Sequence, residues 1–300
     1  MRVIVAYDGS PCADAALIDL HRAGLHRQGD VLAITVAERW LPRPSLVGQA
    51  VEPRSSAAVV TAPETAEDFK RAYELACRAK SRLQSYFTDW KIEAVAATGS
   101  PAQEILRKAK QWSPDLIVLG CQGRSAIARF LLGSVSQKVL NEAPCSVRVC
   151  RGTAWKDGSP VRIVIGLDGS PSSENAVGAV ASRVWPIGSE VRLLSVTDPA
   201  KPRQTDASAT DAQRDLWVRP FVEAAEKKLR EADLTVSSRI ETGDPKQILV
   251  AEADEWGADC IVLGAAASPS TSALGDVSTA VVARAHCSVE IVRALPSWKN

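Results

Sequence analysis

The 300-residue chain has little net charge and no long hydrophobic run. Its 36 basic and 35 acidic residues leave a formal net charge of +1, so no overall field would attract a polyanion. We therefore expect neither nucleic acid nor an anionic membrane as a partner. No apolar run is long enough to span a membrane, and the strand-like run Val3–Tyr7 begins too early to leave room for a signal sequence. We expect a cytoplasmic protein.

Paired cysteines and catalytic signatures are also missing. The seven cysteines are an odd number and include no Cys-x-x-Cys, which argues against a disulfide framework and a zinc knuckle. The sequence contains no Gly-x-Ser-x-Gly elbow and no Gly-x4-Gly-Lys-Ser/Thr loop, and no Gly-x-Gly-x-x-Gly follows the first strand-like run. No nucleophile–base pair stands out. We predict neither catalytic residues nor metal ligands.

What the chain does have is an internal repeat. The run VIVAYDGSP around Asp8 returns as IVIGLDGSP around Asp168, and LIVLG ending at Gly120 returns as CIVLG ending at Gly264. Ordered landmarks of this kind indicate a duplication, and two domains suit the chain length. We expect domains at residues 1–152 and 160–295, with a linker at Arg151–Pro160. Further landmarks recur in the same order: Thr98, Gly99, Pro101 and Gln103 match Thr242, Gly243, Pro245 and Gln247, and Ala143, Cys145, Ser146 and Val147 match Ala285, Cys287, Ser288 and Val289.

Short apolar runs rich in β-branched residues alternate with helical patterns in each copy, which indicates an α/β fold. Near-continuous apolar strands joined by helices form parallel sheets. We predict two tandem open five-stranded sheets, mostly parallel and Rossmann-like, with helices on both faces. Ser10 before Pro11 is a typical N-cap, and the Pro-, Ser- and Ala-rich segment Glu38–Thr65 is expected to be an insertion. The expected strands are Val3–Tyr7, Val31–Val36, Ile92–Ala97, Leu116–Leu119 and Ser146–Val149, then Arg162–Leu167, Val191–Val196, Thr235–Ile240, Ile261–Leu263 and Ser288–Val292.

A glycine motif follows the fourth strand of the first copy. The sequence GCQGRSAIARFLLGS places Gly120, Gly123, Gly133 and Ser134 in a Gly-x2-Gly-x9-Gly-Ser pattern that leads into a helix. Small residues let backbone N–H groups approach an anion, and a helix N-terminus adds unpaired donors and a positive dipole end. The pattern therefore predicts a phosphate-binding loop and hence a nucleotide.

These residues together resemble the universal stress protein family in its tandem two-domain form. The resemblance is carried by Asp8 after the first strand, by the pattern from Gly120 to Ser134, and by the Pro-Cys-Ser-Val opening of the fifth strand, Pro144–Val147. The family's ATP-binding members are similar to the first copy. The resemblance implies one adenine nucleotide per chain, ATP or else ADP or AMP, with magnesium held through the phosphates.

The resemblance also implies where that nucleotide would be held. Ala6, Tyr7 and Asp8 would meet adenine and ribose, and the backbone of Val36 would bond the adenine edge beside Leu119. A carboxylate suits ribose hydroxyls and would repel phosphates. The phosphates and the rest of the ribose would be held by Gly120, Gln122, Gly123, Gly133, Ser134, Val135 and Ser136. Separately from the resemblance, Arg124 lies between the glycines, where its charge could steer phosphate.

Each of these residues also has a role that needs no ligand. The glycines could form a tight turn, Asp8 could cap the following helix, and Arg124 could be a solvated surface residue. In this family the fifth strands commonly form a dimer contact, so Ser146–Val149 and Ser288–Val292 imply an intrachain pseudo-dimer. A homodimer of whole chains stays open.

The second copy departs from the glycine pattern. Gly264 remains, but Ala267 stands in place of the second glycine, and Asp276 stands where the first copy has Ser134. A methyl group at residue 267 disfavours a positive φ, and a carboxylate at the start of the helix would bond the free N–H groups and repel phosphate. We expect the second half to bind ATP weakly or not at all.

Two main hypotheses of function follow. The first is an adenine-nucleotide-binding stress-response protein that acts as a nucleotide-responsive regulatory module, and the sequence favours it. The alternative is a slow Mg-dependent ATPase or phosphotransfer enzyme. A third hypothesis makes both halves interaction scaffolds without a ligand.

Overall fold

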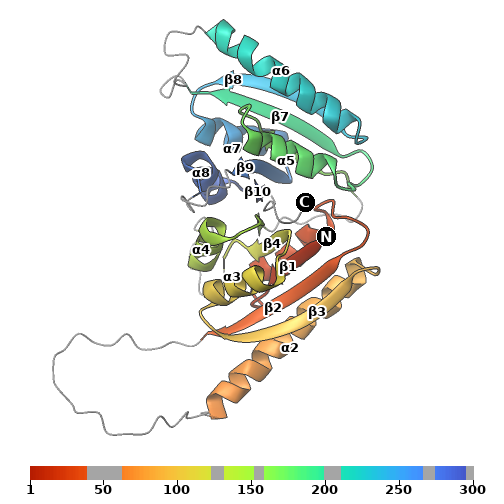
Figure 1. The fold of residues 1–300 in the computed structure, drawn as a ribbon, viewed down its shortest axis with the longest axis vertical. Coiled ribbons are helices and arrows are strands. Elements are labelled where there is room, and N and C mark those ends of the chain that lie inside the picture. The colour runs from red at the N-terminus through yellow and green to blue at the C-terminus, as the bar shows by residue number, and fades with distance from the viewer. Residues whose placement is uncertain (39–62, 123–131, 152–158, 199–210, 266–273, 295–300) are drawn as a thin grey trace, which may run out of the picture.

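The computed structural model describes residues 1–38, 63–122, 132–151, 159–198, 211–265 and 274–294 (Figure 1). The described strands form one ten-stranded sheet in the order β3-β2-β1-β4-β5-β10-β9-β6-β7-β8. Neighbouring strands are parallel except β5 and β10, which pair antiparallel at the centre. The predicted α/β fold is confirmed, and the two expected five-stranded sheets are joined into one.

Each half contributes five strands and four helices to the described part of the chain, in the same order. The two long helices α2 and α6 lie at opposite ends of the molecule (Figure 1). In the first half the elements are β1 (Arg2–Ala6), α1 (Pro11–His21), β2 (Asp30–Glu38), α2 (Pro63–Tyr86), β3 (Lys91–Gly99), α3 (Pro101–Trp112), β4 (Leu116–Gly120), α4 (Ser134–Glu142) and β5 (Ser146–Cys150). In the second half they are β6 (Arg162–Gly166), α5 (Pro171–Ala181), β7 (Glu190–Thr197), α6 (Asp211–Arg230), β8 (Thr235–Thr242), α7 (Pro245–Trp256), β9 (Cys260–Ala265), α8 (Asp276–Arg284) and β10 (Ser288–Arg293).

Alternate residues of the strands point to opposite faces of the sheet, where different helices cover them. Ile4 belongs to a core with Ile105 of α3, whereas Val5 belongs to another with Leu17 of α1 and Leu83 of α2. The core on the α3 side runs without a break into the second half, while each half has its own core on the other face. The helices therefore lie on both faces, as parallel strands with buried faces require.

The local signals in the sequence fix several element boundaries. Ser10 is the N-cap of α1, and its hydroxyl accepts a hydrogen bond from the Ala13 amide at 3.2 Å. The predicted insertion is shorter than expected, because β2 runs through Glu38 and α2 already begins at Pro63. Its remaining residues, 39–62, lie outside the described part. The described helices include none that is long and apolar enough to cross a bilayer.

Candidate functional site

The site lies at the carboxyl ends of β1 and β4. The chain leaves β1 toward β2 on one side, and β4 pairs with β1 on the other side, so the crossovers diverge at this point. Crevices that form where crossovers diverge are the usual ligand sites of open α/β sheets. A cavity of about 570 Å³ opens here, between the β1–α1 turn, the end of β2, α2 and the start of α4.

The turn after β1 is held by hydrogen bonds that its own residues make. Gly9 has a φ of 76°, and the Ser10 amide donates to Asp8 Oδ1 at 2.9 Å. Asp8 therefore forms a local turn, while Ser10 caps the helix, so the capping role considered for Asp8 belongs to its neighbour. Tyr7 is buried, and its hydroxyl donates a hydrogen bond to Asp14 Oδ1 at 2.7 Å. Burial is the main cause that raises the pKa of Tyr7, and the Asp14 carboxylate raises it further.

At the end of β4 the backbone itself comes close to α1. A Cβ on Gly120 would lie 2.8 Å from the backbone carbonyl carbon of Cys12, so only glycine fits. The Cys12 and Cys121 sulfur atoms lie 3.4 Å apart, and burial followed by the Cys12 contact raises the Cys121 pKa to about 11. A thiolate is therefore not favoured at this position.

Helix α4 presents its N-terminus to the cavity without an acidic group. Gly133 is the N-cap and makes no side-chain capping bond, and the first turn contains no Asp or Glu. The Gly133 amide donates to Cys121 O at 2.9 Å, and the Ser136 hydroxyl donates to Gly120 O at 2.8 Å. These bonds fix the start of α4 against the end of β4. The first N–H groups of a helix without a capping side chain suit an anion.

Most of the residues that the sequence predicts for the site surround this one cavity. Two of them, Gly123 and Arg124, lie outside the described residues. The other eleven line the cavity: Ala6, Tyr7, Asp8, Val36, Leu119, Gly120, Gln122, Gly133, Ser134, Val135 and Ser136.

Sequence reasoning missed the part of the lining that comes from α2 and α3. Arg71 of α2 lies at the cavity and donates to Glu67 Oε1 at 2.6 Å, and Asp68 lies beside it. The three- and four-residue spacing of buried alanines in α2 could have identified its buried face. That spacing does not show that the N-terminal part of α2 lies beside this cavity. The other lining residues not predicted are Ala13, Ile34, Thr35, Ala37, Glu38, Ala72, Leu75, Pro101 and Ile105.

The second half has a smaller cavity of about 340 Å³ at the equivalent place. Asp168 and Gly264 line it as Asp8 and Gly120 line the first, but its described lining includes no lysine or arginine. Trp217 occupies the position that Arg71 has in α2, judged from the matching spacing of buried residues in α2 and α6. The second cavity therefore lacks the cationic side chain at this position.

The start of α8 differs from that of α4 by one negative charge. Asp276 is the first residue of α8, after the N-cap Gly275, and its Oδ2 lies 3.9 Å from Lys246 Nζ. Ala267 lies outside the described residues. In the described part, no group of three or more His, Cys, Asp and Glu side chains is arranged to hold a metal ion.

Comparisons with known proteins agree with this organisation. The sequence model of the Universal stress protein family matches residues 1–151 and again 161–293. A universal stress protein of Thermus aquaticus is 31% identical over 149 residues, which are 50% of this chain and 97% of that protein. Universal stress protein Rv2005c of Mycobacterium tuberculosis is 29% identical over 211 residues, 68% of each chain. A crystal structure of a universal stress protein from Archaeoglobus fulgidus has a TM-score of 0.64 at 19% identity, covering 97% of this chain and 96% of its own, a likeness of fold.

Proposed function

The chain belongs to the universal stress protein family, in a tandem form, and we propose that its first half binds one adenine nucleotide and acts as a nucleotide-responsive regulatory module. The two modules would be residues 1–152 and 160–295. ATP is the proposed ligand, with ADP or AMP as the alternatives, and magnesium would enter bound to the phosphates.

The observation that carries the proposal is the first cavity, of about 570 Å³, which brings a carboxylate and an uncapped helix start to one crevice. The N–H groups of Ser134 and Val135, at the positive end of α4, suit the phosphates. Asp8 suits the ribose hydroxyls as an acceptor. Gly120 lets the end of β4 lie directly against α1 at the crevice, because a Cβ there would meet the backbone of Cys12.

Asymmetry between the halves is part of the proposal. Asp276 puts a carboxylate at the start of α8, and a carboxylate within a few ångström of a phosphate repels it. The described lining of the second cavity contains no lysine or arginine, and Lys246, which lies 3.9 Å from Asp276, is not part of that lining. We expect one ATP per chain, bound by the first half.

Calorimetric titration of the full chain with Mg·ATP tests this proposal. We expect one site per chain, and Ser134→Asp, which copies the second half, should weaken binding about tenfold or more, or about 1.4 kcal/mol. Ser134→Asn is the matched neutral control and should bind within about threefold of the original chain. Two sites of similar affinity, or an unchanged affinity in Ser134→Asp, would contradict the proposal.

The same preparation tests the alternative of slow hydrolysis. The described lining of the first cavity contains no histidine or lysine, so a general base would have to be one of the carboxylates Asp8, Glu38 and Asp68. We expect bound ATP to stay intact for hours in a single-turnover assay. Mg-dependent release of phosphate that the Ser134→Asp change abolishes would instead establish the ATPase.

A further inference from the structure

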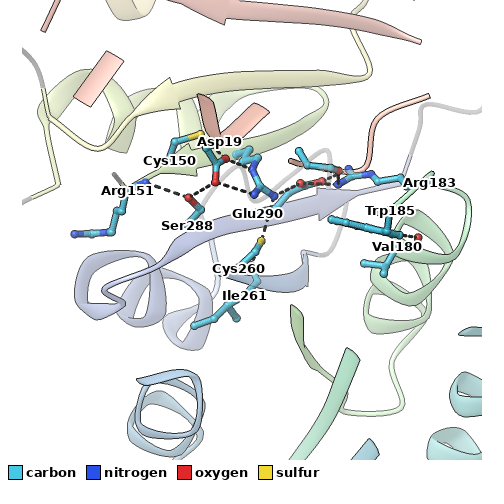
Figure 2. A network of polar contacts seen from close by, with 12 residues as sticks. Asp19, Cys150, Arg151, Val180, Arg183, Trp185, Cys260, Ile261, Ser288 and Glu290 are labelled. Atoms are coloured by element: carbon cyan, nitrogen blue, oxygen red, sulfur yellow. Dashed lines mark hydrogen bonds and ion pairs between the residues drawn. The ribbon is translucent and has the colours of Figure 1, made fainter. Parts of the chain in front are cut away.

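The two halves meet along β5 and β10, and each strand brings a charged residue to the middle of this contact (Figure 2). Arg148 of β5 is paired with Glu290 of β10, and Arg148 Nη1 lies 3.2 Å from Glu290 Oε2. Both side chains are fully buried, at 1% and 0% relative exposure. A buried charge without a partner costs several kcal/mol, and here each of the two charges has the other as a partner.

The register of the strands shows that this pair lies on the two-fold axis that relates the halves. Val147 pairs with Ile291, and Val149 pairs with Val289. The sequence repeat makes Val147 equivalent to Val289, and Val149 equivalent to Ile291. Each of these valines therefore meets the equivalent of the other. Arg148 alone among them meets its own equivalent, Glu290.

We propose that the Arg148–Glu290 pair makes the surfaces of the two halves complementary to each other and incompatible with copies of themselves. Residues on a two-fold axis face themselves whenever two identical halves associate in this register. Two first halves would bring Arg148 against Arg148, and two second halves would bring Glu290 against Glu290. Like charges that are forced together at an interface cost several kcal/mol.

The flanking residues extend the same pattern into a row of alternating charge. Arg148 Nε lies 2.6 Å from Asp19 Oδ2, and Arg183 donates to both carboxylate oxygens of Glu290 (Figure 2). The row reads Asp19, Arg148, Glu290, Arg183. Each half supplies one acidic and one basic residue, so the charges alternate in sign along the row when the two halves are unlike. Two like halves would instead place two arginines or two glutamates side by side.

The flanking charges themselves have no counterpart in the other half. The repeat places Ala179 where Asp19 would recur, and Ala23 where Arg183 would recur. The complete row of four charges therefore forms only when a first half pairs with a second half. Ser288 strengthens it across the contact, because its hydroxyl donates to Asp19 Oδ1 at 2.8 Å.

A steric fit supports the same selectivity. A Cβ on Gly24 would lie 2.5 Å from the Trp185 ring, so the indole of the second half packs directly on this glycine of the first. The amide of Val184 donates to Gly24 O at 3.0 Å at the same contact. The repeat makes Val184 the equivalent of Gly24. In a pair of second halves the Trp185 ring would clash with the side chain of Val184, because that side chain would occupy the same space as the ring.

The nearby ion pair between Arg22 and Asp259, 3.4 Å apart, does not select against pairs of first halves. Asp115 is the equivalent of Asp259 in the first half, so a pair of first halves would keep that interaction. Selection against pairs of first halves therefore depends on Arg148. Selection against pairs of second halves depends on Glu290 and Trp185, and also on the loss of the ion pair, because Ser182 stands where Arg22 would recur.

Cutting the full chain between its halves tests which halves associate. A protease site is inserted within residues 152–158, the folded chain is cleaved, and the two halves are unfolded together in urea and refolded by dilution. Native mass spectrometry then counts the pairs, with the cleaved but never unfolded protein as reference. We expect only pairs of one first half with one second half. Like pairs near their statistical share, or separate halves, would overturn the proposal.

A charge-reversal cycle on intact chains gives a second test that does not require refolding of separate halves. The background is Asp19→Ala with Arg183→Ala, which removes the flanking charges. In that background Arg148→Glu alone and Glu290→Arg alone should each lower the melting temperature strongly, because each creates a like pair. The variant that combines both changes should recover at least half of the loss in melting temperature that the two single changes cause together. A combined loss equal to the sum of the two single losses would overturn the proposal.

Discussion

Gly120 is one of the residues on which the first cavity depends, because α1 approaches the end of β4 without leaving room for a side chain. Replacing it by alanine would put a Cβ 2.8 Å from the carbonyl carbon of Cys12 and 3.0 Å from the Ala13 amide nitrogen. These are backbone atoms, which cannot turn away. Gly120→Ala should destabilise the protein by about 1–3 kcal/mol in urea unfolding and should weaken nucleotide binding.

Gly275→Ala provides the matched control for that change. Gly275 also precedes a helix at the edge of a cavity, but a Cβ there would meet no atom of the described residues within 4 Å. The free energy of unfolding of the Gly275→Ala variant should therefore stay within about 0.5 kcal/mol of that of the original chain. Equal losses in the two variants would show that the close contact at Gly120 is unimportant.

Cys121 should behave as an unreactive thiol. Because burial raises its pKa to about 11, the thiolate is scarce at neutral pH, and the rate of alkylation should keep rising with pH between 8 and 10. Peptide mapping after brief iodoacetamide treatment at several pH values measures this rate. A rate that levels off below pH 9 would contradict the expectation.

Several residues of the site could be predicted because their signals are local in the sequence. Asp8 and Gly120 follow apolar strands, and the repeat marks both as landmarks. Arg71 and Trp217 could not be predicted, since they reach the cavities only through the packing of long helices across the sheet. Their positions depend on contacts between residues far apart in the chain.

At the scale of an element, α1 and α3 differ in how they begin, although both follow a serine and start with a proline. The Ser10 hydroxyl accepts from the Ala13 amide, whereas Ser100 makes no side-chain capping bond. Ser10→Ala should cost about 0.5–2 kcal/mol, and Ser100→Ala should cost much less. Urea unfolding of the two variants measures the difference, and equal costs would contradict it.

The helices and strands were largely predictable from the sequence. The way in which β5 and β10 pair between the two halves was predictable only in outline. Alternating strand and helix patterns indicate parallel sheets, and the family resemblance implies that the fifth strands pair. The register of that pairing, which brings Arg148 opposite Glu290, is not readable from either strand alone. Both halves contribute residues to the core beside these strands, so the pairing involves contacts between residues that are far apart in the chain.

For the whole molecule, the buried charges at the centre should make stability depend on pH. Burial alone would raise the pKa of Glu290, but the guanidinium groups of Arg183 and Arg148 outweigh it and lower that pKa below its usual value of 4.5. Stability from this carboxylate is then fully present above pH 4.5 and is lost as the pH falls through the lower value of the folded state.

Glu290→Gln isolates that contribution. The variant should be less stable than the original chain by about 3 kcal/mol at pH 7. The gap should narrow as the pH falls below 4.5, because Glu290 of the unfolded original chain then binds a proton more readily than Glu290 of the folded chain. Urea unfolding at a series of pH values measures the gap. A gap that stays constant from pH 7 down to pH 3 would show that folding does not lower the pKa of Glu290.

The central strand pair also has a consequence for how the chain is made. β5 is complete when residue 150 has been synthesised, but its partner β10 ends at Arg293. At about 5–20 residues per second a ribosome needs on the order of ten seconds or more to produce that stretch, and the edge of β5 has no partner strand until then. Ribosomes that follow one another on one message hold several such edges close together. An arginine in the middle of each edge would keep these nascent chains from joining to one another while they wait for their own second halves.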